Sequence, residues 1–188
     1  DCTLRRRPPA SRFRIAVVGH LRQEKDPFRA PAALALLPSL REAEIIHVGA
    51  ALEEAMEREA SAWMRREPRY RWLGSLPHGR ALQWIARSHV LVVSSLMEGG
   101  ANVIAEAARI GTPVLASRVS GNLGMLGASY PGYFPVGDHA SLARLIDKCR
   151  SSKYYAKLKT RLDERRALFA PAEEAKALLR VVREALRP

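Results

Sequence analysis

Short runs of β-branched and other apolar residues recur along this chain of 188 residues and alternate with segments that have helical periodicity. Such runs are typical of strands buried on both faces of a sheet. They occupy residues 13–18, 43–48, 70–73, 89–93, 113–116 and, most weakly, 132–135. Helices are predicted at 28–37, 51–66, 77–87, 102–110, 140–149, 154–169 and 173–186. This alternation predicts an α/β fold, a doubly wound parallel sheet with a C-terminal helical extension.

The composition excludes several classes of protein. With 47% hydrophobic and 27% charged residues, the chain is globular rather than disordered. No apolar run approaches the roughly 18–20 residues of a membrane span, so we expect no membrane span. The basic N-terminal residues are not followed by the apolar segment of a signal peptide. Cys2 and Cys149 cannot make a disulfide framework or a CxxC metal site, which favours a reduced, cytoplasmic protein.

The net charge of +12 is concentrated at the two ends of the chain. Residues 1–14 carry +4 and residues 150–188 carry +6, which leaves +2 for the body between them. A basic surface attracts nucleic acid, anionic lipid or a phosphorylated ligand, although solvated helix faces are the simpler interpretation of the tail. No aromatic-rich sheet or recognition helix is visible, so nucleic acid is not the expected partner. We predict a linker or cut edge at 1–12, one domain at 13–150 and C-terminal helices at 151–188.

Ligands of doubly wound sheets bind beyond the carboxyl ends of the strands, so the loops at 19–26, 74–77, 94–102 and 118–127 are the candidate sites. Several common fingerprints are missing from them. The sequence has no GxGxxG, no GxxxxGK[ST] and no GxSxG, and its five histidines show no HExxH spacing. A classical dinucleotide site, a P-loop ATPase, an α/β-hydrolase and a histidine metal site are therefore not indicated.

The strongest local pattern runs from Ser94 to Glu106, where a polar loop leaves a buried strand and two glycines precede a helix. Free amides at a helix N-terminus favour an anion such as a diphosphate, and Gly99 and Gly100 let a ligand approach the backbone. Asn102 could cap this helix. Glu106 suits a vicinal diol such as that of a ribose, and Glu98 could accept sugar hydroxyls. An ordinary helix start with a solvated Glu106 is the alternative.

Two further loops carry weaker patterns. The segment from Gly19 to Asp26 places His20, Arg22 and Lys25 after the first strand, where a cation could neutralise a departing diphosphate. A basic surface loop explains the same residues. Asp26 and Pro27 look like the N-cap and first residue of the next helix. The glycine-rich stretch at 120–127 could offer free amides to a ligand, but a flexible loop is the simpler interpretation.

Together these pieces resemble the C-terminal, donor-binding, Rossmann-like half of a GT-B glycosyltransferase of the family 4 or group 1 type, from residue 13 to about 145. The markers are Gly19-x5-Lys25, Arg71-Trp72-Leu73-Gly74, Glu98-x7-Glu106, Gly111-Thr112-Pro113-Val114-Leu115-Ala116-Ser117 and the Gly121 loop. The resemblance implies a UDP-sugar donor as substrate, with no metal and no other cofactor. It also implies a facing N-terminal acceptor domain that this sequence lacks, without which we expect the isolated chain to be inactive.

The same resemblance implies roles for individual residues. Lys25, Glu98 and His20 would be the catalytic groups, with Lys25 on the diphosphate and Glu98 on the donor sugar. Glu106 would hold the ribose, and the backbone near Ser75 and Leu76 would face the base. The other expected donor-binding residues are Gly19, Arg22, Gly99, Gly100, Ala101, Asn102 and Val103. In this family an arginine usually follows the first-loop glycine, whereas this chain has His20, whose charge at neutral pH depends on its surroundings.

Within the family, several phrases are most similar to the selenosugar synthases, which join a UDP-sugar to selenophosphate. They are Val17-Val18-Gly19-His20-Leu21-Arg22, Pro77-His78-Gly79-Arg80-Ala81-Leu82, Glu98-Gly99-Gly100-Ala101-Asn102-Val103 and residues 130–138. The alternatives are a non-catalytic nucleotide-sugar-binding module, a basic nucleic-acid-binding domain and a relative of the sugar epimerases that share the GT-B architecture. UDP release in the presence of an acceptor would separate the enzyme from the binding module.

Overall fold

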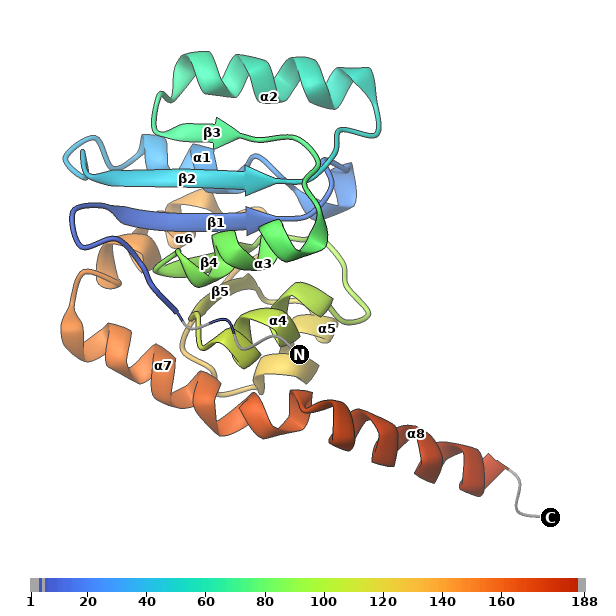
Figure 1. Ribbon diagram of the computed structural model, residues 1–188. Coiled ribbons are helices and arrows are strands. Elements are labelled where there is room, and N and C mark those ends of the chain that lie inside the picture. Colours follow the sequence, from blue (N-terminus) through green and yellow to red (C-terminus); the bar gives the residue numbers. More distant parts are fainter. Residues whose placement is uncertain (1–3, 5, 186–188) are drawn as a thin grey trace.

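The computed structural model describes residues 4 and 6–185, apart from the side chains of residues 171, 174, 177 and 178. Cys2, part of the expected linker and the last residue of the helix predicted at 173–186 lie outside the described residues. Within them, six parallel strands form one sheet in the order β3-β2-β1-β4-β5-β6 (Figure 1). The strands are β1 (Phe13–Val18), β2 (Ala43–Val48), β3 (Tyr70–Trp72), β4 (Val90–Val93), β5 (Val114–Ser117) and β6 (Tyr133–Phe134). The doubly wound parallel sheet is confirmed.

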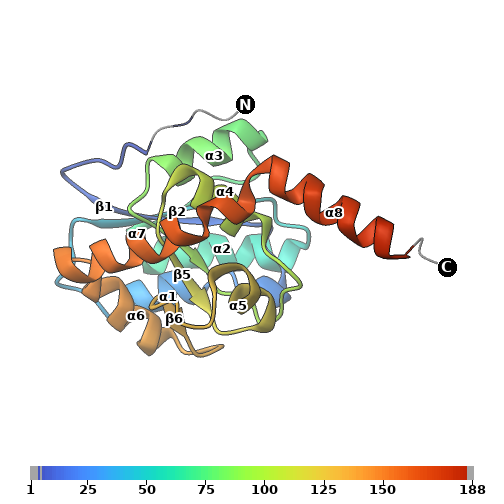
Figure 2. The ribbon, with the colours of Figure 1, turned by 90° about the horizontal axis from the view of Figure 1, so that it is seen from below.

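Helices cover both faces of this sheet. One face carries α3 (His78–Ala86) and α4 (Asn102–Ile110), and the other carries α1 (Arg29–Ala35), α2 (Glu54–Arg66) and α6 (His139–Lys148), as Figure 2 shows. The central strands are apolar on both sides because both sides are covered, and side chains such as Ile15, Leu91 and Leu115 are fully buried. The strand order reverses direction between β1 and β4, so the loops that leave their carboxyl ends run to opposite faces of the sheet and a crevice opens between these loops.

The C-terminal helices behave differently from one another. Leu158 and Leu162 of α7 (Ser152–Arg166) are fully buried and belong to the main hydrophobic core. After the short turn η2 (Ala167–Phe169), α8 (Pro171–Ala185) projects away from the domain (Figures 1 and 2). Among the described residues, no helix has the length and apolar character needed to cross a membrane.

The N-terminal segment lies against the domain. The amide of Arg7 donates to the carbonyl of Ala86 at 2.7 Å. The Arg6 guanidinium lies 5.3 Å from the centre of the Tyr155 ring and donates to the carbonyl of His89 at 3.3 Å. Part of the expected linker is therefore held by α3, α7 and the start of β4.

Three local predictions were wrong. Asp26 does not cap α1, because it has φ = 45° after the 3-10 turn η1 (Gln23–Lys25), and the N-cap is Phe28. The glycine-rich stretch expected as a flexible loop forms the helix α5 (Ser120–Leu126). Asn102 is the first residue of α4 rather than its cap, which is Ala101, so no side chain caps this helix.

Candidate functional site

A cavity of about 480 Å³ opens at the crevice between the carboxyl ends of β1 and β4. Its size is that of an ordinary small-ligand pocket. Nine of the residues expected at the site line it: Gly19, His20, Lys25, Glu98, Gly100, Ala101, Asn102, Val103 and Glu106. The structure therefore brings together residues that lie up to about 90 positions apart in the sequence.

Four expected residues do not line this cavity. Arg22 is exposed and pairs instead with Glu24 at 3.4 Å. Leu76 packs against the hydrophobic cluster of Ile46 and Val48. Ser75 and Gly99 are exposed in the loops that border the cavity.

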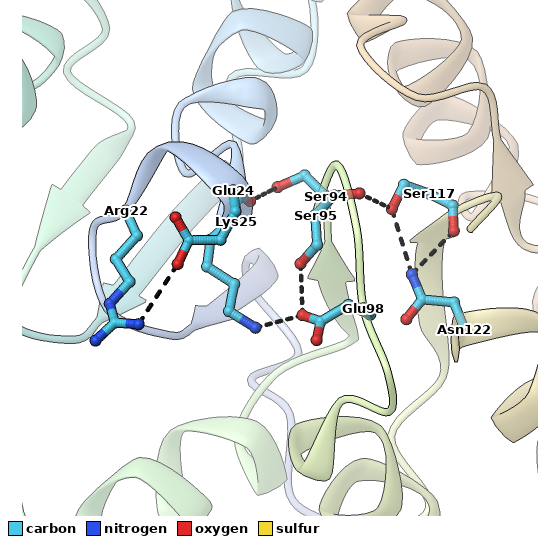
Figure 3. Close-up of polar contacts among 8 residues, drawn as sticks. All are labelled: Arg22, Glu24, Lys25, Ser94, Ser95, Glu98, Ser117 and Asn122. Atoms are coloured by element: carbon cyan, nitrogen blue, oxygen red, sulfur yellow. Dashed lines mark hydrogen bonds and ion pairs between the residues drawn. The ribbon is translucent and has the colours of Figure 1, made fainter. Parts of the chain in front are cut away.

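Hydrogen bonds from the loop after β4 hold the backbone at Lys25 in place. The Ser94 hydroxyl, directly after β4, lies 3.1 Å from the carbonyl oxygen of Lys25, to which it donates (Figure 3). It also donates to the carbonyl of Asp26 at 2.8 Å. The amide of Leu96 donates to the carbonyl of Glu24 at 2.8 Å. The loop after β1 is thus tied to the loop after β4 at three points, which fixes where the Lys25 side chain starts.

The Glu98 carboxylate is the meeting point of two donors. Lys25 Nζ donates to Glu98 Oε1, and the Ser95 hydroxyl donates to the same oxygen at 2.7 Å (Figure 3). The Glu98 side chain is only 9% exposed, whereas that of Lys25 is 36% exposed. The buried carboxylate of Glu98 is stabilised by these charge-assisted hydrogen bonds. The Lys25 side chain remains partly open to the cavity.

A row of buried polar side chains supports this loop from behind. The Ser117 hydroxyl, at the end of β5, donates to the carbonyl of Ser95 at 2.6 Å. The Asn122 amide nitrogen, on α5, donates to the Ser117 carbonyl at 2.9 Å (Figure 3). A Cβ at Gly121 would lie 2.2 Å from the carbonyl oxygen of Glu98, so only glycine lets α5 approach so closely. Sequence reasoning missed this support, and the only signal was the glycine pattern at 121–127.

The N-terminus of α4 forms another wall of the cavity. Gly100, Ala101, Asn102 and Val103 line it, and no side chain caps the helix. The amides of a first helical turn have no intrahelical acceptor, and the helix dipole adds partial positive charge there. This wall suits an anion.

Glu106 lies one turn further along α4 and has a partner that the sequence did not predict. His78 Nε2, at the start of α3, lies 2.8 Å from Glu106 Oε1. Both residues line the cavity. His78 belongs to the segment Pro77-His78-Gly79-Arg80-Ala81-Leu82, but nothing in the neighbouring sequence indicated a role for it.

Two other histidines line the cavity. His20 Nδ1 accepts the amide hydrogen of Ala50 at 3.0 Å, so a neutral His20 carries its proton on Nε2 and remains a donor. The buried His47 lies between the Tyr70 hydroxyl at 2.9 Å and the Gly19 carbonyl at 3.2 Å. Burial lowers the pKa of His47 to about 4, although its hydrogen bond to Gly19 opposes the shift. His47 is therefore neutral and braces the end of β1, a role that its place in an apolar strand did not reveal.

The comparison with protein families identifies the class of the domain. Residues 5–169 match the family of glycosyl transferases group 1, so the chain belongs to that family. Its fold is that of the C-terminal half of GT-B enzymes, in agreement with the fold expected from the sequence. A comparison with curated protein sequences gave no match.

Solved structures with the same fold include the HepE protein of Anabaena, determined with UDP and glucose. It is 23% identical, with a TM-score of 0.79 over 94% of this chain and 48% of HepE. A sucrose-phosphate synthase of Thermosynechococcus elongatus is 24% identical, with a TM-score of 0.75 over 94% of this chain and 47% of that protein. A glycosyltransferase of Rickettsia africae is 17% identical, with a TM-score of 0.79 over 95% of this chain and 49% of its own. The chain thus spans about half the length of these proteins.

Proposed function

We propose that this domain binds a UDP-sugar and forms the donor-binding part of a group 1 glycosyltransferase. The observation that carries the proposal is the cavity at the crevice between β1 and β4. Lys25, the uncapped N-terminus of α4 and the carboxylates of Glu98 and Glu106 all line it. Membership of the family supports the reaction class. The binding of UDP-glucose by HepE, which has the same fold, supports the donor class.

The diphosphate would lie against the N-terminal wall of α4. There it accepts hydrogen bonds from the amides of residues 100–103 and from Lys25 Nζ, while a neutral His20 donates from Nε2. Glu106 would accept the ribose hydroxyls, and the base would lie toward Ser75 and Leu76. Because Lys25 already pairs with Glu98, binding either swings the ammonium to the phosphate or lets it bridge both anions.

Transfer breaks the bond between the sugar's anomeric carbon and the diphosphate oxygen, and the electron pair of that bond leaves with UDP. Positive groups aimed at the departing anion lower the barrier for this step. Lys25, His20 and the amides of α4 would supply that stabilisation, and Glu98 would hold the hydroxyls of the donor sugar. The acceptor would approach from a second domain, since this chain spans about half the length of its structural relatives.

For the acceptor we propose selenophosphate, on the strength of the sequence phrases alone. Its selenium would attack the anomeric carbon and form a C–Se bond as UDP leaves. An anionic acceptor needs a cation or hydrogen-bond donors nearby, and the Lys25 ammonium and the Nε2–H of a neutral His20 are available for this. The test is UDP release by a protein that contains both GT-B halves, which should depend on selenophosphate and fail with sugar acceptors if the proposal is correct. Release with a sugar acceptor instead would contradict it.

Donor binding is tested by calorimetric titration of the 188-residue chain with UDP. We expect micromolar-range binding that is lost or strongly weakened in Glu106→Ala. Glu57→Ala is the matched control, because it removes a carboxylate from the exposed face of α2, away from the cavity. Absence of UDP binding, or equal binding by Glu106→Ala, would contradict the proposed site. Binding without turnover in the two-domain protein would identify the domain as a non-catalytic module.

A further inference from the structure

The contact between His78 and Glu106 joins two helices at the rim of the cavity. His78 is the first residue of α3, and its side chain is 72% exposed. The Glu106 side chain, in the second turn of α4, is 23% exposed. An ionised carboxylate only accepts hydrogen bonds, so the 2.8 Å contact requires the proton on His78 Nε2.

From this contact we infer that His78 is a positioning residue for ribose recognition. It holds one oxygen of Glu106 so that the other oxygen faces the sugar of a nucleotide. The inference rests on the proposed binding of UDP and adds a residue to that site.

The physical basis is preorganisation. A glutamate has three side-chain torsions, and fixing them when a ligand binds costs free energy. His78 fixes Glu106 through Oε1 before any ligand arrives. Among the described residues, no other hydrogen bond reaches this carboxylate, which leaves Oε2 available as an acceptor.

The location of His78 is consistent with this role. It follows the turn that contains Ser75 and Leu76, the segment proposed to face the base, and Glu106 follows the helix start proposed to hold the diphosphate. The ribose of a nucleotide lies between its base and its phosphates. A residue that contacts the carboxylate from the base side is therefore placed beside the ribose.

The contact is not needed to hold α3 against α4. The buried hydroxyl of Thr112, which follows α4, donates to the carbonyl of Ile85 near the end of α3 at 3.0 Å. Leu82, Ile85 and Ile104 are buried in the shared core. Because His78 is exposed, His78→Ala should leave the melting temperature within a degree or two of the parent chain, roughly the range expected for a surface substitution.

The test compares UDP with 2′,3′-dideoxy-UDP, which lacks both ribose hydroxyls. We expect His78→Ala to weaken UDP binding by roughly fivefold, the effect of one modest hydrogen bond, and to leave the dideoxy analogue unchanged. His78→Gln, whose amide can donate to the same oxygen, should restore much of the loss. In a Glu106→Ala background, His78→Ala should have no further effect. Arg80→Ala, an exposed change on the same helix outside the cavity, is the control.

Other outcomes overturn the inference in distinguishable ways. If Glu106→Ala weakens UDP binding but His78→Ala does not, the proposed site stands and the role of His78 is wrong. If His78→Ala weakens both nucleotides equally, the residue is structural and does not act on the ribose. If the parent chain does not bind UDP, or Glu106→Ala binds it normally, the proposed function fails and this inference fails with it.

Discussion

At the scale of single residues, the buried His47 links the stability of the domain to pH. Its pKa is about 4 in the folded chain, whereas an exposed histidine has a pKa of 6.5. The unfolded chain therefore takes up a proton more readily. The free energy of unfolding is highest above pH 6.5 and falls as the pH decreases towards 4.

We predict that His47 alone accounts for about 3 kcal/mol of this loss, from about 1.4 kcal/mol for each unit of pKa difference. Denaturant titrations between pH 4 and pH 7.5 measure it, and His47→Gln should flatten the dependence on pH. Part of the slope that remains should come from His89, whose pKa burial and the charges of Arg6 and Arg14 also lower to about 4. Glu67 should add to it near pH 4, because its hydrogen bond with Arg69 lowers the pKa of its carboxyl group. An unchanged slope in His47→Gln would contradict this assignment.

Lys25 is expected to discriminate between ligands with and without phosphate. Its ammonium lies at the cavity and pairs with Glu98, and in the proposed binding mode it contacts the diphosphate but not the nucleoside. Lys25→Ala should weaken UDP binding by about tenfold, the value of one charge-assisted hydrogen bond, and leave uridine binding unchanged. Equal losses for UDP and uridine, measured by calorimetry, would show that Lys25 shapes the cavity rather than binding phosphate.

At the scale of elements, the site depends on how closely α5 approaches the loop after β4. Gly121→Ala places a methyl group 2.2 Å from the carbonyl oxygen of Glu98, so the loop or the helix must move. We expect a lower melting temperature and weaker UDP binding, because Glu98 and the start of α4 move with that loop.

Gly124→Ala is the matched control on the same helix, because a Cβ there meets nothing within 4 Å. This change should raise the stability slightly, by up to about 1 kcal/mol, because alanine favours helix more than glycine does. If the two variants melted at the same temperature, the close contact at Gly121 would have no energetic importance.

The same elements show what could be predicted from the sequence. The strands were predictable because apolar β-branched runs leave few alternatives, and the helix at 102–110 ends as expected at Gly111, with φ = 86°. The helix α5 could not be predicted, because its two glycines lower the local helix propensity. It is held in place by contacts of Gly121 and Asn122 with other parts of the chain.

Some site residues could likewise be predicted from the sequence, whereas others depend on contacts made only in the folded chain. Lys25, Glu98 and Glu106 follow strand ends, so a parallel sheet brings them to one edge whatever the details of packing. The pairing of His78 with Glu106 depends on how α3 lies against α4, and no local pattern encodes a contact between residues 28 positions apart. The pairing of Arg22 with Glu24 instead of the cavity is likewise a property of the folded loop.

At the scale of the whole molecule, α7 completes the core, whereas no described side chain of α8 is buried in it. Leu158 and Leu162 are fully buried, whereas Leu179, Val181 and Val182 of α8 are exposed. Removal of residues 171–188 should therefore leave the melting temperature nearly unchanged, whereas Leu158→Ala should cost about 2–5 kcal/mol of stability. Thermal melts of the two variants measure this, and a large loss on removing α8 would mean that it contributes to the core.

The proposed function requires a nucleoside diphosphate to bind at the crevice between β1 and β4. The most direct measurement is a crystal structure of the chain with UDP. We expect the diphosphate to lie within hydrogen-bond distance of the amides of residues 100–103, with the ribose hydroxyls on Glu106. UDP bound elsewhere, or a ribose turned away from Glu106, would contradict it.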